Sequence, residues 1–165
     1  MLFGDIETAL ATVTNTRSRL AKIEALAALL RGLDPDEIEP AVGLLTAAPR
    51  QGRLGVGWRT LSARAGDHAD TSNLTIGDVD DAFSALTGIV GAGSAAVRTR
   101  LLDDLAGRAT ATEWHLLVRI MTGELRTGAL EGVLLDAVAR AAERDGALVR
   151  RAAMLSGDLG GTTRI

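Results

Sequence analysis

The chain has 165 residues and a formal net charge of -3, with 47% apolar residues, only 2% aromatic residues and no cysteine. These values describe one domain with a core of Leu, Ala, Val and Ile, and they exclude disulfides, thiolate catalysis and Cys-based zinc sites. No apolar run approaches the roughly 20 residues that span a bilayer, and no signal peptide is visible. We therefore expect a cytosolic protein without a membrane partner.

The basic residues are almost all arginine. Of 18 Lys and Arg residues, only Lys22 is a lysine. A free-standing nucleic-acid binder usually carries a basic surplus, which is absent here. Arginine can grip a phosphate with two parallel hydrogen bonds, which favours local contacts over a diffuse positive field. GC-rich coding would produce the same bias, and both interpretations stay open.

Apolar residues at helical spacing predict three helices in the first 48 residues. They run from Phe3 to Val13, from Leu20 to Leu30, and through Ala41 to Leu45. Gly32 and Pro35 end the second helix. After a loop at 49–57, residues 58–65 predict a short helix, and the polar run 66–73 predicts a surface loop.

The second half carries clearer helix-start signals, including capping pairs. The expected starts are Thr75 with Asp78, Ser94 as an N-cap, Thr110 with Glu113, Ala129 and Ala147. No segment shows a confident period-two alternation. The expected fold class is all-α, a compact multi-helix bundle.

A weak internal repeat occurs at a shift of 76 residues. Among other matches, Ser18 falls on Ser94, Leu26 on Leu102, and Thr46 on Thr122. Each unit then ends in Leu-x-x-Gly, at 54–57 and at 125–128. Two pseudo-symmetric helical units would place two glycine loops on one face. Helices rich in Ala and Leu also align by accident, so chance stays open as an alternative.

Catalytic constellations are missing from the sequence. His68 and His115 have no second His or Cys at ligand spacing, and both are expected to be solvated or helix-surface histidines. The adjacent carboxylates at 80–81 and 103–104 point in different directions on their helices, so they predict solvated faces. No phosphate-binding P-loop or dinucleotide fingerprint is present. We expect no catalytic residue, cofactor or metal in this chain.

Two helix starts could bind a phosphate. Gly93 and Ser94 open a helix that bears Arg98, and free N–H groups there attract an anion. Gly123 and Gly128 flank Arg126, so that exposed amides lie beside a fixed positive charge. A plain N-cap and a plain helix–helix turn are the structural alternatives.

The segment 122–141 resembles the G-x-L-R-x-G-A-L-x-x-x-x-x-x-A-V-A-x-A segment of the DNA-binding domain at the N-terminus of ATP-dependent DNA ligases. Three other segments resemble that domain in the same order, and the likeness covers nearly the whole chain. They are Thr16–Leu26, Arg53–Trp58 and Arg151–Gly160.

The resemblance implies which residues contact DNA. The loop on the minor groove would use Gly123, Arg126, Thr127, Gly128 and Ala129, and Arg19 would contact the backbone. Glu124 stands where some relatives carry a basic residue. The family's adenylated lysine lies in K-x-D-G, whereas Lys22 is followed by Ile-Glu-Ala.

The resemblance also implies a role. Residues 1–165 would be one DNA-binding domain excised from a longer ligase, without its adenylation and OB-fold domains. The chain would bind nicked double-stranded DNA without sequence preference and would not be an enzyme by itself. The parent, in the cytoplasm at the nucleoid, would use ATP and Mg²⁺ to seal nicks in replication, repair and recombination. A helical protein–protein interaction module without DNA affinity is the alternative.

Overall fold

The computed structural model describes residues 1–64, 66, 68–125 and 130–156. These residues contain nine helices and no strand beyond a single bridge between Leu2 and Thr75. The helices are α1 (Phe3–Asn15), α2 (Arg19–Arg31), α3 (Ile38–Thr46), α4 (Trp58–Ser62), α5 (Ile76–Gly88), α6 (Ser94–Arg108), α7 (Ala111–Thr122), α8 (Glu131–Ala141) and α9 (Gly146–Ser156). The all-α prediction is confirmed.

Side-chain capping accounts for the starts of α2, α5 and α7. Thr75 forms a capping box with Asp78 at the start of α5, and Thr110 forms one with Glu113 at the start of α7. The predicted N-cap at Ser94 is wrong by one residue. Gly93 is the N-cap, with φ +80°, and Ser94 is the first helical residue. Glycine adopts this left-handed conformation without the steric penalty that a serine would meet.

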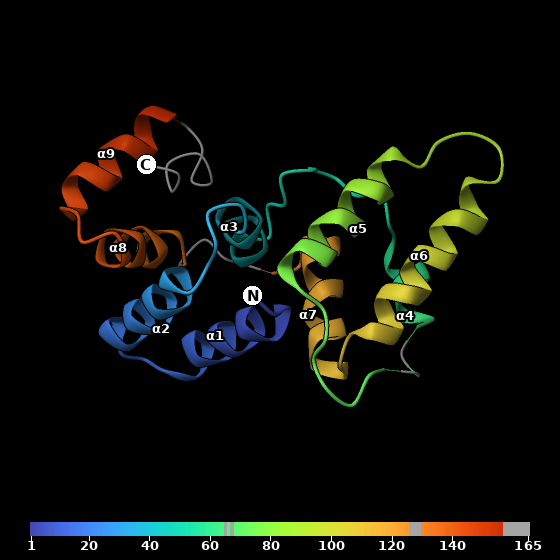
Figure 1. Ribbon diagram of the computed structural model, residues 1–165, viewed down its shortest axis with the longest axis horizontal. Helices are drawn as coiled ribbons and strands as arrows, with labels where there is room; N and C mark the ends of the chain where they lie inside the picture. Colours follow the sequence, from blue (N-terminus) through green and yellow to red (C-terminus); the bar gives the residue numbers. More distant parts are fainter. Residues whose placement is uncertain (65, 67, 126–129, 157–165) are drawn as a thin grey trace.

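The helices form two halves. The fourth helix of each repeat unit, α4 or α8, packs in the half formed by the other unit. α1, α2, α3, α8 and α9 lie together in one half, and α4 to α7 lie in the other (Figure 1). α8 packs on α2, whereas α4 packs on α7. Two segments therefore cross between the halves. The first crossover segment is residues 47–57, and the second runs from Gly123 to Leu130 and is described at 123–125 and 130.

The repeat expected at a shift of 76 residues is visible in the backbone. Ala47 ends α3 and Gly123 ends α7, both in the left-handed conformation. Reciprocal hydrogen bonds join the starts of the two units. Phe3 N donates to Leu74 O at 2.8 Å, and Ile76 N donates to Met1 O at 3.1 Å. Matching ends and a shared central contact fit two pseudo-symmetric units.

One apolar core runs through both halves. Leu26 and Leu102, which the repeat equates, are both fully buried, as are Phe3 and Phe83. α9 is peripheral, since α8 is its one extensive neighbour among the described helices. None of the described helices is long and apolar enough to cross a membrane.

Candidate functional site

The first crossover segment and the C-terminal end of α7 line one groove of about 800 Å³. Its walls are residues 47–49, 52–58 and 120–124. The groove thus contains the Leu-x-x-Gly loop of the first unit beside Gly123 and Glu124, the residues that precede the corresponding loop in the second. Exchange of α4 and α8 explains this, because α3 and α7 each lead into a segment whose next helix lies in the other half.

Exposed backbone forms much of this groove. Gly52, Gly55 and Gly123 are exposed and have φ values of +70°, +65° and +70°. A left-handed residue turns the chain sharply and, as glycine, puts no side chain over the neighbouring peptide groups. Such a surface can approach a ligand backbone closely.

A buried carboxylate holds the first crossover segment against α5. Asp80 is 7% exposed and accepts from Arg50 Nε at 2.9 Å and from Gln51 Nε2 at 2.8 Å. Burial raises the pKa of Asp80, but the hydrogen bonds from Arg50 and Gln51 outweigh it, so the pKa lies below its usual value. The expectation that Asp80 lies on a solvated face is wrong. Its function is to anchor the segment, and Arg50 is committed to it.

Arg98 is also committed to an internal role. Its guanidinium donates to Gly55 O at 3.0 Å and to Ile89 O at 3.3 Å. These bonds support the floor of the first crossover segment from α6. Gly93 and Ser94 lie at the outer end of α6, far from the C-terminal end of α7 (Figure 1). The structure therefore does not bring Ser94 and Gly123 into one site.

Arg19, expected to contact DNA backbone, has a carboxylate partner. Its guanidinium lies 2.8 Å from Asp136 and 3.3 Å from Gly132 O, both on α8. The side chain is 62% exposed, so this ion pair is well solvated. Arg19 joins α2 to the helix that crosses over from the other unit.

The loop predicted to lie on DNA falls mostly outside the described residues. The predicted contacts that lie outside the described residues are Arg126, Thr127, Gly128 and Ala129. Gly123 is described and lines the groove. Glu124 lines it too, with an exposed side chain.

Arg53 is the basic residue that the sequence could not rank. It lines the groove and is exposed, and within the described residues its guanidinium has no hydrogen-bond or carboxylate partner. Arg50, three residues earlier, is paired. Sequence offered one signal for Arg53, because the resembling segment begins at this residue, but nothing local separates the two arginines.

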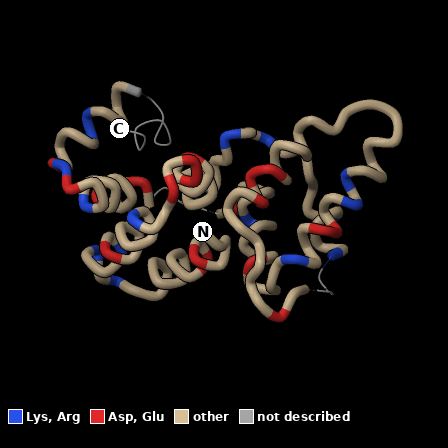
Figure 2. The backbone as a smooth tube through the Cα atoms, in the orientation of Figure 1, with Lys and Arg blue, Asp and Glu red and all other residues tan. Residues whose placement is uncertain are grey.

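Charges are mixed over the molecule. Basic and acidic residues are interleaved along both halves (Figure 2). This pattern agrees with the net charge of -3. Any anion bound here would depend on local contacts rather than on a long-range field.

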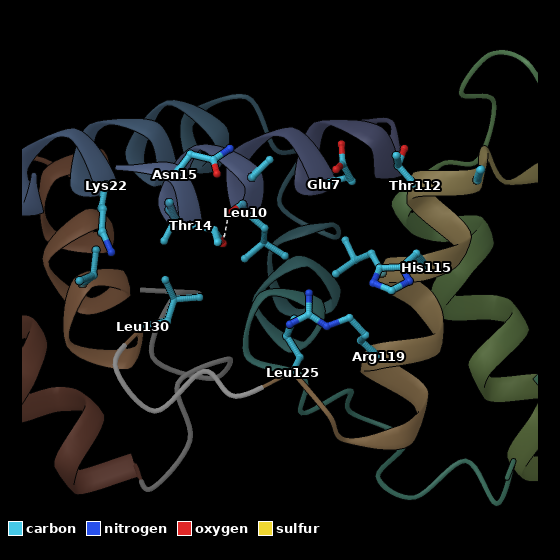
Figure 3. A pocket seen from close by; sticks show the side chains of 15 residues that line it. Glu7, Leu10, Thr14, Asn15, Lys22, Thr112, His115, Arg119, Leu125 and Leu130 are labelled. Carbon is cyan, nitrogen blue, oxygen red and sulfur yellow. Dashed lines mark hydrogen bonds between the residues drawn. The ribbon is translucent and has the colours of Figure 1, made fainter. Parts of the chain in front are cut away.

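A second groove, of about 590 Å³, lies between α1, α7 and the start of α8 (Figure 3). Lys22, His115 and Arg119 stand around an apolar floor that includes Leu10 and Leu130. The repeat equates Lys22 with Arg98, which bridges two carbonyl groups in the other half. Within the described chain the Lys22 ammonium makes no corresponding hydrogen bond. The second groove therefore remains open beside Lys22.

The histidines have no ligand geometry. His68 is half-buried rather than solvated, because its ring lies 6.2 Å from that of Trp114 and its Nδ1 lies 3.0 Å from Ala106 O. His115 borders the second groove. No group of three potential metal ligands exists among the described residues.

The family model and the curated relatives that match this chain point to the same family. Residues 58–139 match the family model described as DNA ligase N terminus. The chain is 57% identical over 162 residues to a probable DNA ligase of Pseudarthrobacter chlorophenolicus, and 49% identical over 162 residues to one of Rhodococcus jostii. Each match covers 98% of this chain but 32% of the relative. The chain spans about a third of the length of these curated relatives.

Proposed function

Since this chain belongs to the family of DNA ligase N-terminal domains, we propose that it binds duplex DNA without sequence preference and holds nicked DNA for a ligase. The supporting observation is the groove in which the first crossover segment and Gly123 present glycine backbone beside Arg53, for which the described residues supply no partner. An enzyme that acts at any nick needs contacts to phosphate and sugar rather than to base edges.

The groove suits such contacts. The backbone N–H of Gly55 can donate to a phosphate oxygen, and Arg53 can add a charged fork. The N–H groups of Gly52 and Gly123 already donate to Pro49 O and Ile120 O, so these two glycines contribute close approach rather than donors. In this proposal the loop at 126–129 lies on the minor groove. Gly93 and Ser94 would form a separate contact at the outer end of α6.

The proposal extends to the longer protein. The relatives are about three times the length of this chain, which leaves room for an adenylation domain and an OB-fold domain. Those domains would supply the reactive lysine and use ATP and Mg²⁺ to join a 5′-phosphate to a 3′-hydroxyl. The DNA-binding chain would be inert alone. It would act in the cytoplasm, at the nucleoid, in replication, repair and recombination.

Titration with a nicked duplex at two salt concentrations tests the proposal. We expect weak, salt-sensitive binding, because each neutralised phosphate lowers log K by about 0.9 per decade of salt. Arg53→Ala should reduce that slope by about 0.9 and weaken binding to all sequences alike.

A matched control is Arg144→Ala. Arg144 is exposed between α8 and α9 and does not line the groove. This variant should bind like the wild type. Absence of duplex binding at both salt concentrations, or a loss confined to particular sequences, would contradict the proposal.

The interaction-module alternative is less favoured. Its supporting observation is α9, where Leu148, Met154 and Leu155 are exposed. Family membership favours DNA, and an apolar stripe on one peripheral helix is also expected in a chain that covers 32% of its relatives. If the domain bound no duplex but self-associated through α9, the alternative would replace the proposal.

A further inference from the structure

Trp58 is an aromatic side chain that the core does not use. It is 56% exposed and lines the groove at the end of the first crossover segment. The chain's other aromatic residues, Phe3, Phe83 and Trp114, are each 4% exposed or less. An indole left in water forgoes the favourable free energy of burial, so its place in the groove calls for another explanation.

Gly57, the residue before it, is the N-cap of α4, where the fold gives glycine only the modest preference that it has over alanine. Its φ of -91° and ψ of 155° are open to any residue. A Cβ at this position would meet no atom within 4 Å. Gly52 and Gly55 differ, because their positive φ values favour glycine. Gly57 therefore leaves space on the groove side that nothing in the described chain fills.

We propose that Gly57 and Trp58 form an apolar contact with the sugar edge of the duplex, an inference that rests on the function proposed above. The bare backbone at Gly57 lets the strand approach, and the indole lies against deoxyribose C–H groups. Apolar side chains are a recurring means of contacting DNA from the minor-groove side.

This contact differs physically from that of Arg53. A guanidinium on a phosphate releases counterions, so its contribution falls as salt rises. An indole on sugar buries apolar surface and releases no ion, so its contribution is independent of salt. The two residues therefore have separable signatures in one titration.

The first experiment compares Trp58→Ala, Trp58→Phe and Gly57→Ala with the wild type at two salt concentrations. Trp58→Ala should weaken binding roughly tenfold, a typical loss for an aromatic contact to nucleic acid, by the same factor at both concentrations. Trp58→Phe should restore most of the affinity. Gly57→Ala should weaken binding while lowering the midpoint of thermal unfolding only slightly, since alanine is a poorer N-cap than glycine.

Gly107→Ala is the matched control. Gly107 lies in α6 outside the groove, and a Cβ there would also meet nothing within 4 Å. This variant should bind DNA like the wild type. Wild-type affinity in both Trp58→Ala and Gly57→Ala would overturn the inference, as would a loss that shrinks with salt.

Intrinsic fluorescence provides a readout that does not depend on an alanine variant folding. In a Trp114→Phe background, Trp58 is the single tryptophan. A nicked duplex at saturation should shift or quench its emission. Unchanged emission at saturation would overturn the inference while leaving the proposed function intact. Failure of the wild type to bind any duplex would instead remove the proposed function, and this inference with it.

Discussion

The hydroxyl groups of Thr46 and Thr122, which lie 76 residues apart, donate to Val42 O and Val118 O at the same distance of 2.8 Å. Each bond closes the last turn of its helix, just before a left-handed residue. The third helices of the two units, α3 and α7, therefore end with the same side-chain hydrogen bond as well as the same backbone conformation. Both crossover segments leave from this shared ending.

The left-handed residues after these threonines give a reciprocal stability prediction. Ala47 has φ +52°, a conformation that costs alanine about 1 kcal/mol or more. Ala47→Gly should raise the free energy of unfolding by about 0.5–1 kcal/mol, after the greater freedom of glycine in the unfolded chain is subtracted. Gly123→Ala should lower it by a similar amount. Chemical denaturation of both variants and of the wild type checks this prediction. A free energy of unfolding equal to that of the wild type in both variants would contradict it.

Asp80 predicts acid sensitivity. Its pKa is lowered in the folded protein, so its stabilising contribution is complete above the unfolded value of 3.8 and is lost as pH falls through the lower folded pKa. Asp80→Asn should cost about 1–2 kcal/mol at pH 7, less than a fully buried pair because Arg50 is 48% exposed. Below pH 4, the free energy of unfolding of the Asp80→Asn variant should fall less steeply with decreasing pH than that of the wild type.

The control for this pH profile is Asp78. Hydrogen bonds from Thr75, with a further contribution from Arg108, hold its pKa below the usual value. Asp78 titrates in the same window, so Asp80→Asn should retain part of the acid sensitivity. A profile identical to that of the wild type would exclude Asp80 as a contributor.

Glu124 predicts a gain in DNA affinity. Its exposed carboxylate lines the groove and would repel a phosphate. Glu124→Gln should tighten duplex binding several-fold at low salt and less at high salt, because the repulsion is screened. Glu143→Gln, between α8 and α9, makes the same charge change away from the groove and should have no effect. Weaker binding by Glu124→Gln would show that the carboxylate supports the site.

Arg19 predicts a small effect where the resemblance implies a large one. Its guanidinium is held by Asp136 but is well exposed, so Arg19→Ala should cost at most about 1 kcal/mol of stability. Duplex affinity should change less than twofold, compared with the larger loss expected for Arg53→Ala. A tenfold loss in a salt titration would mean that Arg19 leaves Asp136 for DNA.

Helix positions could be predicted from the sequence because their signals are local. The Thr75–Asp78 and Thr110–Glu113 pairs satisfy backbone groups within one turn, and apolar spacing selects the buried face. Ser94 failed as an N-cap because a left-handed glycine beside it took the position. The repeat, although weak in sequence identity, paired Thr46 with Thr122, and the structure shows that α3 and α7 both end at these residues.

The candidate site could be predicted only in part. The glycine loop of the first unit was recognised in a motif, yet Gly57 and Trp58 were not selected as contacts. Asp80 looked like a solvated acid, because adjacent aspartates on a helix give no sign of which one is buried. Arg50 and Arg53 lie in one loop, and apart from the motif that begins at Arg53 the sequence gives no sign of which guanidinium finds a carboxylate partner.

By itself, then, the chain's order of residues determined nine helical segments in the described part, two related units and membership in a ligase family. Only the tertiary structure decided that α4 packs in the second half and α8 in the first. The same packing decided which arginines form ion pairs. The physical reason is range. Capping and periodicity act within a few residues, whereas the partner of a guanidinium is chosen by packing between helices as distant in sequence as α2 and α8.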